Sequence, residues 1–277
     1  NLWLETPYFN QNWRGDYLEI VRILRAIGFE VNVLFGPESG GAKEWKDIPK
    51  ADFNLLIGTW NGLKIVKHLE KKYSQRYLHI DRLPIGEEAT TSFIRKVVEF
   101  GGIDKTKSEE FIKKESEIYY YFLEHFANFF SEYWYGLPAK FAAVGSSTDV
   151  LSYSTFLTDQ LGLIPVKQII TDNPPENLRE QISESFKHLS EDVSVDVEFH
   201  EDGYFVEKSL SETDFGSGVP LLLGSSWEAD VARSKKALLI EVSAPSTETL
   251  VVTRSFAGYR GGLNLIERVY SAAVGNK

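Results

Sequence analysis

The 277-residue sequence contains neither cysteine nor methionine. Without thiols the chain can form no disulfide, and it supplies no thiolate to a metal ion or to an iron–sulfur cluster. Because even an initiator methionine is missing, we expect the sequence to be a processed or cut piece of a longer protein.

Long apolar runs are also missing. No stretch approaches the ~18 consecutive apolar residues of a membrane-spanning helix, so we expect no membrane partner. The first residues have neither a basic start nor an apolar core, which favours a cytoplasmic protein over a secreted one. The apolar share of 43% is enough for one large packed domain or for two of ordinary size.

The net charge of −10 is unevenly distributed. Residues 172–214 hold 13 acidic and 3 basic residues, whereas the rest of the chain holds 27 of each sign. A solvated acidic face explains this stretch, and a docking surface for a basic partner is the alternative. Nucleic acid is not an expected partner of the chain, because phosphate binding needs clustered lysine and arginine.

Apolar strand-like runs alternate with segments of helical period along most of the chain. In the first part the pattern predicts strands at 31–35, 53–57 and 77–80. In the last part it predicts five strands, at residues 140–144, 165–171, 193–199, 221–223 and 237–242. Residues 107 to about 135 contain no glycine or proline, which predicts one long helix whose aromatic residues, Phe111, Phe122 and Phe126 among them, pack in the core or at an interface.

Strict alternation of strands and helices implies parallel sheets with helices on both faces. We therefore predict an α/β fold with two Rossmann-like, doubly wound parallel-sheet domains joined by a long helix. The predicted domains are residues 1–104 and 137–277, and the bridging helix is residues 105–136.

A short apolar run followed by Gly-Ser-Ser occurs twice, and FNLLIGTWNG (53–62) is a looser copy. Ligands of open α/β sheets bind beyond the carboxyl ends of the strands, where glycine permits a sharp turn and serine can cap the next helix. The candidate cofactor-binding residues are therefore Gly145, Ser146, Ser147, Gly224, Ser225 and Ser226. The alternative is that they only form turns between strands and helices.

Glu198, His200 and Asp202 alternate along one predicted strand, and carboxylate and imidazole groups are metal ligands. They are candidate metal ligands, with an exposed strand end as the alternative. No residue is assigned a catalytic role, because neither serine that follows a glycine lies in a GxSxG motif.

Several segments resemble one known family. They include LPIGEEATTSFIRKVVEFGG (83–102), LGLIPVKQIITDNPPE (161–176) and SFAGYRGGLNLIERVY (255–270). In order and spacing they resemble the nitrogenase component 1 family, and within it the C-terminal two-thirds of the molybdenum–iron protein beta chains.

The resemblance implies an oxidoreductase subunit, a nitrogenase, acting in a heterotetramer of two alpha and two beta chains. The implied partners are the alpha subunit, a second beta subunit and the iron protein (component 2). The full complex carries the P-cluster, an iron–sulfur cluster, and the iron–molybdenum cofactor. The family's cluster cysteines lie in an N-terminal domain that the sequence does not match, so the resemblance implies a scaffold that binds no cofactor and is inactive when isolated.

Two alternatives stay open. The first is a paralogue of the same fold, either a cofactor-assembly scaffold or a subunit of the related tetrapyrrole reductases. The second is a small-ligand-binding module that uses a cleft between the two predicted domains.

Overall fold

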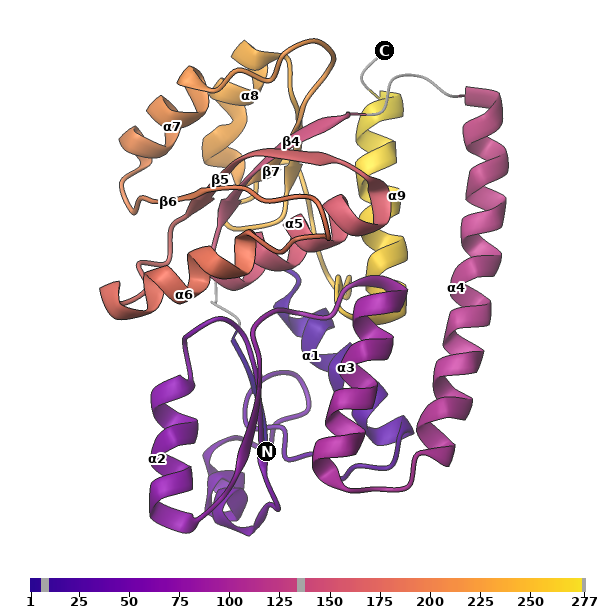
Figure 1. Ribbon diagram of the computed structural model, residues 1–277, viewed down its shortest axis with the longest axis vertical. Coiled ribbons are helices and arrows are strands. Elements are labelled where there is room, and N and C mark those ends of the chain that lie inside the picture. Colours follow the sequence, from indigo (N-terminus) through magenta and orange to yellow (C-terminus); the bar gives the residue numbers. More distant parts are fainter. Residues whose placement is uncertain (6–9, 134–137, 276–277) are drawn as a thin grey trace. The chain divides into compact units, whose positions relative to one another are not determined.

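The computed structural model describes residues 1–5, 10–133 and 138–275 (Figure 1). The chain forms two compact units, and neither is continuous in sequence. The first unit contains residues 1–6, 12–127 and 252–264, and the second contains residues 7–11, 128–251 and 265–277. The domain boundaries at residues 104 and 136 stay predictions.

The first unit contains a parallel sheet with the strand order β1-β2-β3. The strands are β1 (Leu2–Leu4), β2 (Asn54–Ile57) and β3 (Tyr77–Ile80). The helical elements are α1 (Trp13–Ala26), the 3-10 helix η1 (Gly41–Lys50), α2 (Leu63–Tyr73), α3 (Gly86–Gly101) and α4 (Thr106–Tyr133), whose residues from 128 on belong to the second unit.

The first unit departs from the sequence prediction at one strand. The strand predicted at 31–35 is wrong, since this segment makes only an isolated parallel bridge between Val33 and Leu2. The chain turns directly after it at Gly36, whose φ is 95°, and the Phe35 side chain is exposed. The sheet is completed instead by β1, whose three buried residues are too short a run to show any period.

The second unit contains a five-stranded parallel sheet with the order β6-β5-β4-β7-β8. The strands are β4 (Lys140–Gly145), β5 (Ile164–Ile170), β6 (Val197–Phe199), β7 (Leu221–Gly224) and β8 (Leu238–Glu241). The helical elements are α5 (Ser147–Leu161), α6 (Glu176–Phe186), α7 (Gly203–Glu212), the 3-10 helix η2 (Ser226–Glu228), α8 (Ala229–Lys235) and α9 (Gly258–Gly275), which starts within the first unit. The predicted α/β class with parallel sheets is confirmed.

The order of the five strands makes the second unit doubly wound. The chain runs outward from β4 to β6 and then returns to place β7 on the other side of β4. Figure 1 shows α5 and α6 on one side of this sheet and α7 and α8 on the other. On the second side Ala142 and Val144 of β4 pack with Val206 and Leu210 of α7 and with Val231 of α8.

The long predicted helix is confirmed as α4, and predicted residues 134 and 135 lie outside the described part of the chain. Between residues 106 and 128 its buried positions are Ser108, Ile112, Glu115 and Tyr119, which recur at helical spacing. Phe122 is exposed within this chain, so it does not pack in the core, and the alternative that it packs at an interface stays a prediction. Among the described residues no helix combines the length and apolar character needed to span a membrane.

A buried carboxylate attaches the segment 252–264 to the start of the first unit. Asp16 of α1 is fully buried, and its Oδ1 accepts hydrogen bonds from Ser255 Oγ (3.0 Å) and from the backbone N–H groups of Phe256 (2.7 Å) and Ala257 (2.9 Å). Burial raises the pKa of Asp16 to about 6, although these hydrogen bonds act in the opposite direction.

The raised pKa gives a test based on pH. A carboxyl group whose folded pKa exceeds its unfolded value of 3.8 stabilises the fold most below that value, and this contribution is lost as the pH rises through about 6. Between pH 7 and pH 4 the free energy of unfolding of the wild type should therefore increase relative to Asp16→Asn, by up to about 3 kcal/mol. Urea unfolding across this range measures the difference.

The control for this test is Asp192→Asn, which alters an exposed aspartate of the second unit. Its unfolding free energy should follow that of the wild type across the whole range. If the free energy of unfolding changed with pH equally in the wild type and in Asp16→Asn, the assignment of a raised pKa to Asp16 would be contradicted.

Candidate functional site

The two Gly-Ser-Ser segments lie side by side at the carboxyl edge of the second sheet. The strands that they follow, β4 and β7, are neighbours and pair Ala143 with Leu223. Beyond them the backbone diverges, because the Gly145 carbonyl accepts from Thr171 N–H beside β5 (2.8 Å), whereas the Gly224 carbonyl accepts from Val242 N–H beside β8 (2.8 Å). This divergence defines the topological switch point, where ligands of open α/β sheets bind.

On the β4 side, the serines bond to groups of the same chain. Ser146 caps α5, and its Oγ accepts from Asp149 N–H (3.2 Å). Ser147 donates its N–H (3.0 Å) and its Oγ–H (2.8 Å) to the two carboxylate oxygens of Asp172. Asp149 in turn accepts from Asn10 Nδ2 (2.8 Å). In the first turn of α5, Ser147 therefore bonds to the Asp172 carboxylate, the Asp149 N–H bonds to Ser146, and the Asp149 carboxylate bonds to Asn10.

On the β7 side, Ser225 and Glu228 form a capping box. Glu228 Oε2 accepts from the Ser225 N–H (2.6 Å) and from its Oγ–H (2.8 Å), and Ser225 Oγ accepts from Trp227 N–H (3.2 Å). Burial raises the pKa of Glu228, and the two bonds from Ser225 oppose that shift. The next residue, Ser226, donates its backbone N–H to the Pro245 carbonyl (2.8 Å).

The looser third copy occupies the equivalent place in the first unit. Gly58 directly follows β2 and has a φ of 141°, and a Cβ there would lie 2.2 Å from Cβ of Glu5, which follows β1. Glu5 Oε2 accepts from the N–H groups of Trp60 (3.0 Å) and Asn61 (3.1 Å). Only glycine permits this close approach of the two strand ends.

The carboxylates that bond to these edges were not predicted from the sequence. Glu5, Asp172 and Glu241 each end or closely follow a buried strand, and this spacing is the signal that could have identified them. Glu241 of β8 accepts from the N–H groups of Thr247 (3.0 Å), Glu248 (3.1 Å) and Thr249 (2.9 Å), and from Ser246 Oγ. Burial would raise its pKa, but these bonds outweigh it and lower the pKa.

The structure brings two of the three candidate metal ligands together. His200 Nε2 lies 3.2 Å from Glu198 Oε2, which also accepts from Ser209 Oγ (2.5 Å), while Lys167 Nζ donates to Glu198 Oε1 (2.5 Å). Burial would raise the pKa of Glu198, but the bonds from Lys167 and Ser209 outweigh it and lower the pKa. Asp202 instead caps α7 through Tyr204 N–H (2.9 Å).

A groove of about 440 Å³ lies over this cluster, and Phe205, Lys208 and Asp214 also line it. Glu198 is already paired with a lysine, so a metal ion would have to displace that ion pair. Across the described ranges no group of three or more histidine, aspartate or glutamate side chains is placed to hold a metal ion. Metal binding by Glu198, His200 and Asp202 stays a prediction.

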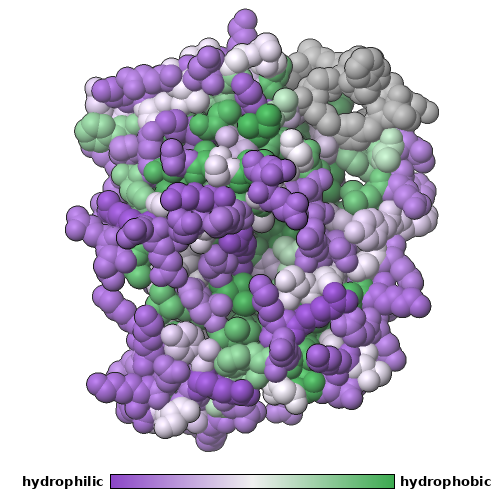
Figure 2. All heavy atoms as spheres, viewed as in Figure 1, coloured by the Kyte–Doolittle hydropathy of each residue, from purple (hydrophilic) through white to green (hydrophobic). Residues whose placement is uncertain are grey.

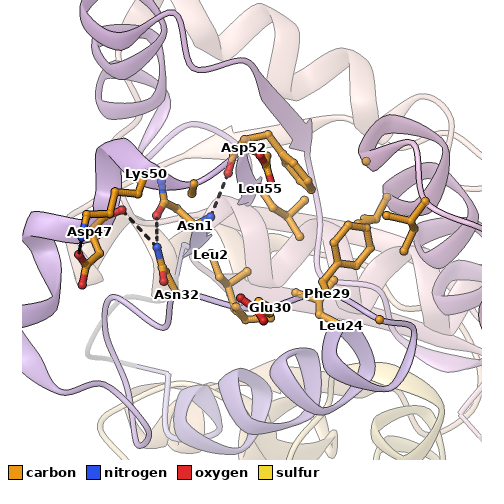
Figure 3. A pocket seen from close by; sticks show the side chains of 17 residues that line it. Asn1, Leu2, Leu24, Phe29, Glu30, Asn32, Asp47, Lys50, Asp52 and Leu55 are labelled. Carbon is orange, nitrogen blue, oxygen red and sulfur yellow. Dashed lines mark hydrogen bonds and ion pairs between the residues drawn. The ribbon is translucent and has the colours of Figure 1, made fainter.

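A larger cavity, of about 640 Å³, lies in the first unit (Figure 3). Leu2, Leu24 and Phe29 line its apolar part, and Asn32 and the Asp47–Lys50 ion pair line its polar part. The cavity opens at the amino ends of β1 and β2, opposite the edge at which ligands of parallel sheets bind. We therefore place the candidate site at the carboxyl edges.

The class of this protein is defined by two discontinuous α/β units with parallel sheets, each of which has a strand–glycine segment at its carboxyl edge. The description "nitrogenase component 1 type oxidoreductase" belongs to the family model that matches residues 6–273, and the chain belongs to this family.

The chain is similar to two kinds of named protein. The chain is 29% identical over 202 residues to the nitrogenase molybdenum-iron protein beta chain of Methanococcus maripaludis, covering 73% of this chain and 40% of the relative. It is 33% identical over 105 residues to a subunit of the light-independent protochlorophyllide reductase of Angiopteris evecta, covering 38% of this chain and 20% of the relative.

A solved structure titled "Nitrogenase Cp1 at pH 6.5" has the same fold, with a TM-score of 0.73 at 21% identity. The alignment covers 99% of this chain and 60% of that one. The chain thus spans less than two-thirds of the length of each of these relatives.

The residues present do not fit the clusters that the family resemblance implies. Iron–sulfur clusters are held by cysteine thiolates, and the chain contains no cysteine. The polar groups at the switch points are serine hydroxyls, carboxylates and backbone amides that bond to one another. That a cofactor binds at the two Gly-Ser-Ser segments stays a prediction.

The capping box gives a test of how much these polar groups stabilise the fold. Ser225→Ala removes a cap and one of the hydrogen bonds to buried Glu228, so the free energy of unfolding should fall by about 1–2 kcal/mol. Ser226→Ala is the matched control and should change it by less than about 0.5 kcal/mol. Urea unfolding measures both variants, and equal losses would contradict the assigned cap.

Proposed function

We propose that this chain is the part of a component 1 type subunit that carries no cluster, and that it acts as a scaffold. In the assembly it packs against an alpha-type subunit and a second beta-type subunit, and it supports the domain that holds the P-cluster. Dinitrogen reduction, with electrons from an iron protein, is then a property of the complete cytoplasmic heterotetramer. The two relatives, one named as a beta chain and the other as a reductase subunit, support a role within an assembly.

One observation carries this proposal: the chain's own carboxyl groups accept hydrogen bonds from the polar groups at the carboxyl edges of the two sheets. In the second unit Asp172 binds the N–H and hydroxyl of Ser147, and Glu228 binds those of Ser225. In the first unit Glu5 accepts hydrogen bonds from the backbone N–H groups of Trp60 and Asn61. A ligand at these edges would have to break the hydrogen bonds between these carboxyl groups and the serines or backbone N–H groups, and leaving such groups without partners is unfavourable.

The runner-up is a subunit of a tetrapyrrole reductase. The 33% identity to the protochlorophyllide reductase relative favours it, but that similarity covers only 38% of the chain, whereas the nitrogenase beta chain aligns over 73%. We rank the nitrogenase-type assembly first because its similarity extends over both units.

The first experiment measures metal content. The purified chain, treated with iron and sulfide under reducing conditions, should retain less than about 0.1 iron per chain, because it offers no thiolates. A chain that retains a stoichiometric cluster would refute the scaffold proposal.

The second experiment separates the two assemblies. The chain is co-expressed with the genes that flank it, and affinity purification should recover an alpha-type subunit in equal amount. The purified complex is then assayed with its iron protein for acetylene reduction and for protochlorophyllide reduction. Acetylene reduction is the expected result. Protochlorophyllide reduction would favour the runner-up, and recovery of the chain alone would contradict a scaffold in either assembly.

A further inference from the structure

Helix α2 carries a concentration of positive charge in an acidic protein. Lys64, Lys67, Lys71 and Lys72 lie on its exposed surface, and Glu70 is the one acidic residue within the helix. Leu63, Val66 and Leu69 form the buried side of the same helix. The helix therefore has a net charge of +3 on its outer face, while the whole chain has −10. We call these four lysines the α2 lysine face.

The α2 lysine face makes no ion pair with any described residue, although other lysines of the chain do. Lys50 pairs with Asp47 (2.6 Å), Lys167 with Glu198 (2.5 Å) and Lys187 with Glu184 (2.9 Å). The ammonium groups of α2 are therefore not paired with a carboxylate within the described chain, although Lys72 Nζ lies 4.8 Å from the centroid of the Tyr73 ring. This is so even though acidic residues outnumber lysine and arginine by 40 to 30 overall.

Helix stability does not explain the lysine face. Lys64 and Lys67 are three residues apart, Lys67 and Lys71 four, and like charges at these spacings repel by about 0.2–0.5 kcal/mol per pair. Lys64 also lies in the first turn, where the helix dipole disfavours a cation. Only Lys71 and Lys72, in the last turn, are favourably placed.

Apolar side chains accompany the lysines on the exposed side of α2. Ile65 is 45% exposed, and Tyr73 at the end of the helix is 42% exposed. In Figure 2 the surface at the place of α2 is mainly hydrophilic. Exposed apolar groups surrounded by charges of one sign are typical of a surface that binds a partner of the opposite charge.

We propose that the α2 lysine face is a docking surface for an acidic protein. Ionic screening over about 8–10 Å lets this local charge act despite the chain's net negative charge. A protein partner is favoured over nucleic acid because the helix is only about 16 Å long. At that length it would contact few phosphates, and the chain's net charge would repel the remainder of a long polyanion.

The test uses a fluorescently labelled peptide of twelve glutamates as the probe for an acidic protein surface. Its affinity for the full chain is measured by fluorescence anisotropy at 50 and 300 mM NaCl. The triple variant Lys64→Gln, Lys67→Gln and Lys71→Gln should bind the peptide at least tenfold more weakly than the wild type. The wild-type affinity should itself fall at the higher salt concentration.

The matched control is Lys107→Gln, Lys113→Gln and Lys114→Gln, three exposed lysines of α4 in the same unit. This variant changes the net charge by the same amount, and its affinity for the glutamate peptide should lie within about twofold of the wild-type affinity. Circular dichroism melting verifies that both variants are folded. This readout needs neither a cluster nor another subunit, so it is independent of the proposed function.

Three outcomes would overturn the proposal. Equal weakening in the two variants would mean that the peptide responds to net charge and not to α2. Tighter binding of a twelve-nucleotide single-stranded DNA than of the glutamate peptide, lost in the α2 variant, would assign the surface to nucleic acid. No detectable binding of the peptide at 50 mM NaCl would also refute a docking surface.

Discussion

Parallel strand pairing is the constraint on which the rest of this structure depends. Because every strand in each sheet runs the same way, every crossover needs a helix, and all carboxyl ends meet at one edge. In the second sheet the chain diverges at that edge between β4 and β7, which is where a ligand would bind in this kind of sheet. In the first sheet the carboxyl ends of β1 and β2 meet at the same edge. The residues at these two places determine the functional interpretation.

At both places carboxyl groups of the chain itself accept hydrogen bonds from the polar groups at the edge of the sheet. Asp172 and Glu228 bind the serines of the second unit, and Glu5 binds the turn after β2 in the first. These carboxylates stabilise the turns but leave few free donors for a bound group. Within a family of oxidoreductases this arrangement favours a scaffold, since the thiolates that clusters require are absent from the chain.

Charge divides the chain into surfaces of opposite sign. The stretch 172–214 is strongly acidic and spans α6, β6 and α7, whereas α2 is basic. The proposed scaffold would need surfaces that select partners, and segregated charge provides selectivity and faster association. The lysines of α2 and the carboxylates of α6 are therefore consistent with the proposed scaffold, which would act by binding other proteins.

The sequence by itself determined the fold class and the position of the candidate site, because alternating apolar periods and the Gly-Ser-Ser segments depend only on local chemistry. It also determined that no thiolate is available. Periodicity could not find β1, whose three residues show none, and it mistook residues 31–35 for a strand. Only the tertiary structure decided which carboxylate meets which turn, since Asp16 binds residues some 240 positions later. Such pairings depend on how the crossover connections bring distant segments of the chain together, and no local sequence pattern specifies this arrangement.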